Sequence, residues 1–335
     1  MRDLPAGVDE TALRRGLRAW GVAAVRLDYA PLGFGDYHWR VTDTGGRHWF
    51  LTVSDLSRKP HCGDGPRAAY EGLRGALDTA GALRAAGLDF VVAPLPGRDG
   101  STVQRMDGRY GLSLQPWVDG SAGEFGQRLG AAERARVMRT LAALHRAVAP
   151  ATARTPAPGL PSRSGWESVP PGTDSHPEVG PRTAAARALL RRHGTALRRR
   201  LAEFDRLVGE VSARADAPVV THGEPHPGNL LWGPDGEVRL IDWDTCGRSF
   251  PERDLWHVAA REEGGFDDEA LSVWAVESGR TPDPSALELY RLRWDLDDVS
   301  AFWELFRAPH EHCADTEAAW EGLTGTVARL VNGPG

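Results

Sequence analysis

Lysine is almost absent from this sequence. Of its 40 basic residues, all but Lys59 are arginine. Codon bias in a GC-rich genome accounts for this composition and for the abundance of Ala, Gly and Pro. Whatever its origin, the bias leaves Lys59 as the one position at which chemistry that requires a lysine ammonium can occur.

Cysteine and long apolar runs are also scarce. Cys62, Cys246 and Cys313 are too few and too scattered for a disulfide framework or a zinc site, which favours a reducing compartment. No stretch approaches the roughly 18 apolar residues of a membrane span, and the first ten residues lack the basic and apolar leader of a secreted protein. We therefore expect a cytoplasmic protein without a membrane partner.

Basic charge is in the minority, because 46 acidic residues oppose the 40 basic ones and give a net charge of -6. This balance argues against nucleic acid as a partner, since binding to the phosphate backbone needs a basic face. The chain has 335 residues, of which 41% are hydrophobic, and this is enough for one large domain or two lobes with a substantial core.

The first third of the chain reads as a small unit that mixes helices with strands. Asp9 can cap a helix whose apolar positions recur at helical spacing until Gly21 ends it. The sequence then predicts strands within 24–56 around a turn at 43–46, a helix at 68–86, and strands at 90–95 and 112–118.

The remainder is richer in helices. They are expected at 131–148 and 182–214, and further helices alternate with turns after Pro251. Between the two long helices, residues 149–180 are rich in Pro, Ser, Thr and Gly without periodicity, which is typical of a flexible loop or lid. Residues 217–245 read as a strand, a polar loop and a hairpin of two short strands.

The polar loop of that segment carries the most informative cluster. His222, Glu224, His226 and Asn229 lie within eight residues, between two pairs of apolar residues that pin the loop at both ends. The hairpin that follows should bring the Asp242 carboxylate near the Asn229 amide. Carboxylate and amide oxygens together suit a hard cation such as Mg²⁺, and Glu224 is then left to act as a base beside it.

Two simpler interpretations compete with this one. A loop rich in Gly, Pro, Asp and Asn is often only a turn, and this holds for either half of the cluster alone. The spacing of His222 and His226 also raises zinc, but a helical H-E-x-x-H site is excluded because Gly223, Pro225 and Pro227 break a helix. We therefore reject zinc and favour the two halves acting together.

Three motifs in this region resemble one known family. The runs H-G-E-P-H-P-G-N at 222–229, I-D-W-D at 241–244 and P-E-R-D-L at 251–255 are similar to motifs of the aminoglycoside phosphotransferase family, nearest to spectinomycin-phosphotransferase-like proteins. The resemblance implies an α+β, two-lobed, protein-kinase-like fold. Residues 1–116 would form an N-lobe with a small antiparallel sheet that binds nucleotide. Residues 117–335 would form the larger helical C-lobe, with the catalytic loop and the acceptor site.

The resemblance also implies roles for individual residues. Asn229 and Asp242 match the two magnesium ligands, and Glu224 occupies the place of the aspartate that accepts the proton of the substrate hydroxyl. The co-substrate is ATP or GTP. The positions that match its hinge and its short phosphate-covering loop are Gln115, Trp117, Gly33 and Gly35, although a tight turn explains the two glycines equally well.

Two catalytic positions depart from the pattern of the family. The lysine expected on a strand of the N-lobe is Thr52, which offers the phosphates a hydrogen bond but no charge. Lys59 or Arg58 could reach in from the next loop, although a solvated surface position is the simpler expectation for Lys59. The helix glutamate that partners the family's lysine corresponds to either Glu71 or Asp78.

Glu224 is the second departure, because the family has aspartate at this position. The longer side chain moves the carboxylate by about 1 Å, and a misplacement of that size costs on the order of 10²-fold in rate. The two departures leave two functions open. The leading one is an O-phosphotransferase, and the alternative is an impaired nucleotide-binding pseudokinase or a repurposed kinase-fold protein.

The acceptor is predicted from charge. The segment 261–317 is rich in Asp and Glu, which suits a cationic, polyhydroxylated small molecule of the aminoglycoside or aminocyclitol kind, and hence a role in antibiotic resistance. Alternatively, these carboxylates pair with arginines on helix surfaces. We expect Trp294, Trp303 and Phe306, which are interleaved with them, to belong to the core rather than to an aromatic binding platform.

Overall fold

The computed structural model describes residues 1–156, 159–161, 163, 178–261 and 264–333. They fall into two compact units: the first comprises 1–156, 217–259 and 267–281, and the second comprises the described residues of 157–216, 260–266 and 282–335. The predicted catalytic loop and the predicted nucleotide-binding sheet both belong to the first unit. The lobe boundary at 116/117 falls inside that unit and stays a prediction.

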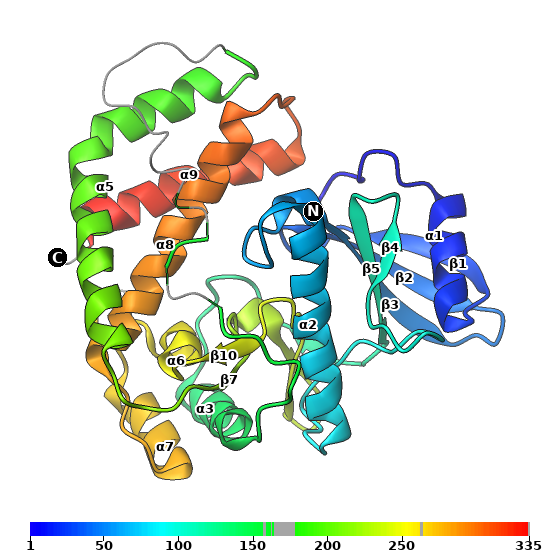
Figure 1. Cartoon of the computed structure of the whole chain (residues 1–335), viewed down its shortest axis with the longest axis horizontal. Coiled ribbons are helices and arrows are strands. Elements are labelled where there is room, and N and C mark those ends of the chain that lie inside the picture. Colours follow the sequence, from blue (N-terminus) through cyan, green and yellow to red (C-terminus); the bar gives the residue numbers. More distant parts are fainter. Residues whose placement is uncertain (157–158, 162, 164–177, 262–263, 334–335) are drawn as a thin grey trace. The chain divides into compact units, whose positions relative to one another are not determined.

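The N-terminal part of the first unit is built around a five-stranded antiparallel sheet in the order β1-β2-β3-β5-β4 (Figure 1). Its strands are β1 (Ala24–Ala30), β2 (Asp36–Asp43), β3 (His48–Asp55), β4 (Gln104–Met106) and β5 (Tyr110–Pro116). The first three confirm the strands predicted within 24–56. The turn between β2 and β3 forms because the Asp43 carboxylate accepts hydrogen bonds from the backbone N–H groups of Gly45 and Arg47.

Helices α1 (Glu10–Leu17) and α2 (Gly65–Ala85) cover opposite faces of this sheet (Figure 1). Neighbouring residues of a strand point to opposite faces. In β5, Leu112 belongs to one apolar cluster with Leu17 of α1, whereas the space beside Gly111 is filled by Leu73 of α2. The Asp9 side chain caps α1 by accepting a backbone N–H, as its position in the sequence predicts.

One predicted strand is wrong, and one strand lies where turns are expected. Residues 90–95 form no strand, because their backbone groups bond at scattered points, to Leu240 from Phe90 and Val92 and to Leu114 from Leu95. The edge strand is β4, which lies in the turn-rich sequence that follows. A short apolar run predicts that its residues are buried more reliably than it predicts which groups its backbone hydrogen-bonds to.

The rest of the first unit combines helices with short strands. The helices are α3 (Ala131–Arg146), α6 (Glu252–Ala259) and α7 (Asp268–Ser278). The strands are β6 (Ser121–Ala122), β7 (Val219–Thr221), β8 (Leu230–Trp232), β9 (Val238–Leu240) and β10 (Gly247–Ser249). β8 and β9 form the predicted hairpin, β6 lies on the other side of β8, and β7 pairs with β10. The polar loop is thus fixed by β7 before it and β8 after it.

The second unit contains long helices that pack on one another, α5 (Thr183–Ser212), α8 (Pro284–Arg307) and α9 (Ala314–Asn332). Trp303 and Phe306 are fully buried, which confirms that they belong to a core. Of the flexible loop predicted at 149–180, residues 157–158, 162 and 164–177 lie outside the described residues. No helix in the described part of the chain is both long and apolar enough to cross a membrane.

Candidate active site

The polar loop at 222–229 is held by the carboxylate of Asp254, near the start of α6. Asp254 is fully buried and accepts hydrogen bonds from the backbone N–H groups of His222 (2.8 Å) and Gly223 (2.7 Å). Gly223 has a φ of 104°, and a Cβ there would lie 2.4 Å from the guanidinium of Arg253, so the position requires glycine. The loop therefore starts from a fixed backbone position.

Asp254 is in turn held by His145 of α3. The Nε2 atom of His145 lies 3.0 Å from the Asp254 carboxylate, and its Nδ1 atom accepts a hydrogen bond from the indole N–H of Trp274 in α7. Because an indole can only donate, Nε2 is the nitrogen that donates to Asp254. Burial alone would raise the pKa of Asp254, but the hydrogen bond from His145 and the neighbouring charged side chains together outweigh it and lower that pKa.

His222 joins the loop to the segment that carries Asp242. Its Nε2 atom donates to the carbonyl of Ile241 (2.8 Å), so its Nδ1 atom is the one that accepts the backbone N–H of Glu224. Burial lowers the pKa of His222, which favours this neutral tautomer, and its ring makes an edge contact with Trp243. Both ring nitrogens are used in holding the loop against the aspartate segment.

Glu224, the predicted base, lies half-buried in the middle of this loop. Its backbone carbonyl accepts a hydrogen bond from the side-chain amide of Asn229 (2.9 Å). Burial, followed by the negative charge of Asp244, raises the pKa of the Glu224 carboxyl to about 7. A carboxyl with such a pKa exchanges its proton near neutral pH, as a general base must.

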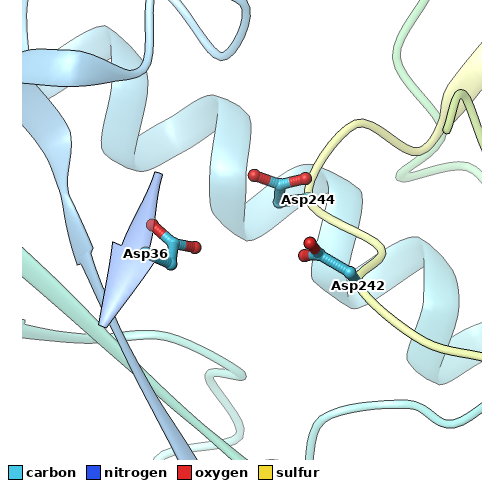
Figure 2. Close-up of side chains that lie close together, drawn as sticks. All are labelled: Asp36, Asp242 and Asp244. Carbon is cyan, nitrogen blue, oxygen red and sulfur yellow. The ribbon is translucent and has the colours of Figure 1, made fainter. Parts of the chain in front are cut away.

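Three carboxylates converge near this loop, from Asp36, Asp242 and Asp244 (Figure 2). One oxygen of each lies within 4.8 Å of the others. Asp36 is the first residue of β2, whereas the other two follow β9. Asp242 has a φ of 63°. This left-handed conformation costs a non-glycine residue about 1–3 kcal/mol and tends to occur at functional sites.

The oxygen atoms that these carboxylates offer as ligands suit a divalent cation. Oδ1 of Asp36 is buried and has no hydrogen-bond partner among the described residues. The dense protein surroundings of Asp242, together with the charges of Asp244 and Asp36, raise the pKa of its carboxyl well above the usual value. Such excess negative charge is what a cation bound to carboxylate oxygens relieves.

Asn229 approaches the same place from the loop. Its backbone carbonyl accepts the N–H of Ile241 (3.1 Å), the residue before Asp242. Its side-chain nitrogen donates to the carbonyl of Glu224. The structure therefore places Asn229 and Asp242 on adjoining segments, as the hairpin in the sequence predicts.

Lys59 lies among the carboxylates, with only 5% of its surface exposed. Its Nζ atom is 2.5 Å from Asp244 and 3.0 Å from Asp36. Burial opposes the charged form, but these two carboxylates raise the pKa of Lys59 well above its usual value, so it stays charged. The expectation of a solvated Lys59 is therefore wrong. Arg58, by contrast, is half-exposed and pairs with Asp55 (3.8 Å).

Thr52, where the resemblance predicts a strand lysine, is buried with its hydroxyl 3.2 Å from Nδ1 of His38. The two candidate helix carboxylates have partners of their own. Glu71 pairs with Arg74 (2.8 Å), and Asp78 accepts a hydrogen bond from the hydroxyl of Thr102 (2.7 Å). The carboxylates that contact Lys59 come instead from β2 and from the segment after β9.

The predicted hinge lies at the end of β5. The side-chain nitrogen of Gln115 donates to Ser113 (3.1 Å), while its Oε1 atom is buried without a hydrogen-bond partner among the described residues. Trp117 is 38% exposed, and its indole N–H donates to Asp119 (3.0 Å). The guanidinium of Arg40 lies 4.7 Å from the Trp117 ring centroid. An exposed aromatic ring is thus fixed next to the end of the sheet.

The predicted phosphate-covering loop connects β1 to β2. Gly33 and Gly35 have φ values of 63° and 108°, which other residues rarely adopt, and a Cβ at either would meet nothing within 4 Å. Met1 holds the loop, because its sulfur accepts the N–H of Gly35 (3.2 Å) and its amino group donates to the carbonyl of Gly33 (3.1 Å). The next residue is Asp36, so this loop leads directly into the carboxylate cluster.

The acidic segment at 261–317 offers less free charge than its composition indicates. Several of its carboxylates pair with arginines: Asp267 with Arg134, Asp295 with Arg329, Asp297 with Arg293 and Glu304 with Arg307. Glu262 and Glu263 lie outside the described residues. The pairing favours the alternative that these carboxylates are partners of arginines, although Asp267 and Asp295 are buried rather than on a helix surface.

Some members of the site go beyond the sequence prediction. Asp244 and Asp254 lie in the recognisable motifs, so the sequence carried a signal for both. In the sequence, Asp36 is marked as a site residue only by its position after the two glycines. No comparable signal marks His61, whose Nε2 is 3.3 Å from Asp244. His145 has no local signal, because its role depends on the packing of α3 against α6.

Comparisons with known proteins agree with this geometry. Residues 29–290 match the model of a family described as "Phosphotransferase enzyme family". Protein StrN of Streptomyces griseus is 26% identical over 306 residues, which cover 89% of this chain and 85% of that protein.

Solved structures of low sequence identity share the fold. A spectinomycin phosphotransferase, APH(9)-Ia, in complex with ADP and spectinomycin matches with a TM-score of 0.71 at 16% identity, covering 98% of both chains. An amicoumacin kinase, hAmiN, in complex with AMP-PNP and Ca²⁺ has a TM-score of 0.60 at 15% identity, covering 97% of this chain and 94% of that one. A microcompartment-associated aminopropanol kinase has a TM-score of 0.59 at 21% identity, covering 96% of each. These likenesses confirm the predicted α+β, two-lobed, kinase-like fold.

Proposed function

The chain belongs to the phosphotransferase enzyme family, and we propose that it transfers the γ-phosphoryl group of ATP or GTP to a hydroxyl of a small-molecule acceptor. The observation that carries the proposal is the convergence of the Asp36, Asp242 and Asp244 carboxylates within 4.8 Å, near the loop that holds Glu224, and the raised pKa of Glu224, about 7, supports it. A base poised to take a proton and a set of oxygens suited to a cation are two parts that phosphoryl transfer needs.

Asn229 and Asp242 would hold the Mg²⁺. When bound, this ion neutralises charge on the phosphates and helps to orient them. Two observations support the fit. Oδ1 of Asp36 has no hydrogen-bond partner among the described residues, and burial, followed by the charges of Asp244 and Asp36, raises the pKa of Asp242. The left-handed backbone of Asp242 is consistent with a position retained for function rather than for stability.

Glu224 would accept the proton of the acceptor hydroxyl. Its raised pKa makes the carboxylate a better proton acceptor than an ordinary surface glutamate. Asp254 and His222 fix the loop backbone, so the longer Glu224 side chain extends from a defined backbone position rather than from a mobile one. This fixed backbone supports a catalytic role for glutamate in place of aspartate.

The nucleotide would lie along the N-terminal sheet. Its contacts on the phosphate side and at the hinge would come from Gly33, Gly35, Thr52, Lys59, Gln115 and Trp117. Open space beside the two loop glycines and the buried Oε1 of Gln115 without a partner among the described residues support this arrangement.

The acceptor would be a cationic, polyhydroxylated molecule of the aminoglycoside or aminocyclitol kind, phosphorylated in the cytoplasm as a form of antibiotic resistance. The paired acidic residues give this choice little support. Its main support is that relatives of this fold include phosphotransferases named for spectinomycin, amicoumacin and aminopropanol.

A panel of acceptors tests the proposal. The protein with Mg²⁺ and either ATP or GTP should consume nucleotide when an aminocyclitol, an aminoglycoside, a macrolide or an amino alcohol is added, and mass spectrometry should find the phosphorylated acceptor. Glu224→Gln is the matched control and should lose this turnover while keeping nucleotide binding. If the protein binds Mg²⁺-nucleotide but phosphorylates no acceptor in the panel, the pseudokinase alternative replaces this proposal.

A further inference from the structure

The strand position and the positive charge of the phosphate-binding lysine of kinases are divided here between two residues, Thr52 and Lys59. Kinases bind the phosphates of their nucleotide with a strand lysine that is itself paired to a helix glutamate. In this chain the strand position is the neutral Thr52. The single lysine of the sequence comes later, just after the 3₁₀ turn η2 (Leu56–Arg58) that follows β3.

The Lys59 ammonium lies where two segments of the proposed nucleotide site meet. One of its partners is Asp36 (3.0 Å), which directly follows the glycine loop at 33–35. The other is Asp244 (2.5 Å), two residues beyond Asp242. A structural ion pair could sit anywhere in the fold, whereas this one joins the phosphate-covering loop to the segment proposed to hold the cation.

Donor count and charge leave this ammonium able to bind a further group. An ammonium has three N–H donors, of which two face the carboxylates of Asp36 and Asp244. Three carboxylates surround the Lys59 ammonium, and His61 beside Asp244 is a second group that can carry positive charge. A divalent cation that enters with a polyphosphate reduces the repulsion between the phosphates and these carboxylates. Once a cation balances the carboxylates, the third donor of Lys59 can bind a phosphate oxygen.

We propose that Lys59 is the phosphate-binding cation of this protein and that Asp36 and Asp244 position it, in place of a helix glutamate. The inference rests on the proposed function, because it needs a nucleotide at this site. It removes the main objection to an active enzyme, since the absence of a lysine at Thr52 no longer leaves the phosphates without a charged ligand.

Isothermal titration calorimetry of the full chain with Mg²⁺-ATP and Mg²⁺-GTP tests the proposal. Lys59→Met should raise the Kd on the order of 10- to 100-fold, because a charged hydrogen-bond donor to the phosphates is lost. The matched control Arg58→Met removes the neighbouring cation, which is half-exposed and pairs with Asp55, and should bind like the wild type.

Nucleosides separate a phosphate contact from a structural role. Adenosine or guanosine carries no phosphate, so its Kd should be the same for the wild type and Lys59→Met; a weaker nucleoside Kd in the variant would point to a merely structural lysine and overturn the proposal. Equal Kd values of the two proteins for Mg²⁺-nucleotide would overturn it as well. If the wild type binds neither nucleotide, the proposed function and this inference fall together.

The single lysine allows a second test in the wild type, where the folding of a variant plays no part. With an acyl phosphate of the nucleotide, the Lys59 ammonium first gives one proton to water, and its nitrogen then attacks the acyl carbonyl. An amide bond forms as the bond between the acyl carbon and the phosphate oxygen breaks, the nucleotide leaves as its phosphate, and a second proton passes from the nitrogen to water. Peptide mapping should find the acyl group on Lys59, and an excess of Mg²⁺-nucleotide should suppress it. An unlabelled Lys59 in a protein that binds nucleotide, or labelling that the competitor does not reduce, contradicts the proposal.

Discussion

The ammonium of Lys59 lies 2.5 Å from the carboxylate of Asp244, although 185 residues separate the two in the chain. Together with Asp36, this pair links the N-terminal sheet to the aspartate segment through one buried positive charge. Removing one member of a buried pair leaves an uncompensated charge and costs about 3–5 kcal/mol. We therefore expect the contact to matter for stability as well as for the proposed phosphate binding.

Lys59→Met should lower the free energy of unfolding by about 3–5 kcal/mol. Mg²⁺ should restore part of that loss, because the three carboxylates then attract a cation without competition from the ammonium. Urea unfolding with and without MgCl₂ measures both effects. Arg58→Met is the control and should change stability by less than about 1 kcal/mol, since the Arg58 side chain is half-exposed and the buried Asp55 keeps its closer pair with Arg109 (2.6 Å). An equal gain from Mg²⁺ in the wild type and Lys59→Met would contradict this account.

Asp242→Ala should abolish the thermal stabilisation that Mg²⁺-nucleotide confers, because the variant loses a proposed cation ligand and its charge together. Alanine also alters a strained, left-handed backbone position. Asp107→Ala is the matched control, since Asp107 is an exposed aspartate with a φ of 51° in the turn between β4 and β5. The control should keep the full nucleotide-induced shift. A full shift in Asp242→Ala would remove the metal assignment.

The ratio kcat/KM should rise with pH through about 7 and level off above it. Glu224 must be ionised to accept the hydroxyl proton, and burial and the charge of Asp244 raise its pKa to about that value. Glu224→Gln should lower turnover by on the order of 10²–10⁴-fold and eliminate this acidic limb. If the limb persists in the Gln variant, another group is responsible for it and the role of Glu224 as the base is wrong.

Local sequence was sufficient where the interacting residues are close in the chain. The loop at 222–229, the hairpin of β8 and β9 and Asp242 fall within one short stretch. Turn chemistry and strand alternation there define both the backbone path and the residues that meet. Lys59 could be named as a candidate because it is the only lysine, although its burial could not.

The rest of the site depends on contacts between distant segments. Asp36 contacts Lys59 and Asp244 only because β2 begins where the glycine loop at 33–35 stops, beside the aspartate segment. No periodicity in the sequence predicts that contact. His145 reads in the sequence as one polar position of an amphipathic helix. Its role becomes visible only when α3 packs against Asp254 and Trp274. The strand at 104–106 is missed for the same reason, since its partner β5 decides it.

Asp254→Asn should lower the free energy of unfolding by about 1–3 kcal/mol at neutral pH, because a buried acceptor of two backbone N–H groups loses its charge. The native pKa of Asp254 is depressed, so its contribution is present above the unfolded value of about 4 and is lost as pH falls through the native pKa. The difference in the free energy of unfolding between the wild type and Asp254→Asn should therefore become smaller only at acidic pH. Urea unfolding at several pH values measures it, with the exposed Asp89→Asn as control. A difference that does not change with pH would argue against an ionised Asp254.

The length of the Glu224 side chain decides whether this site is adapted to glutamate or impaired by it. Glu224→Asp keeps the carboxylate but withdraws it by about 1 Å. Because Asp254 fixes the backbone at His222 and Gly223, the loop cannot shift to follow it. Turnover should therefore fall about 10²-fold while the Kd for Mg²⁺-nucleotide stays unchanged, which steady-state kinetics and calorimetry together resolve. A rise in kcat would instead mean that the site still fits the shorter aspartate, and that the native glutamate slows a reaction for which the rest of the constellation is arranged.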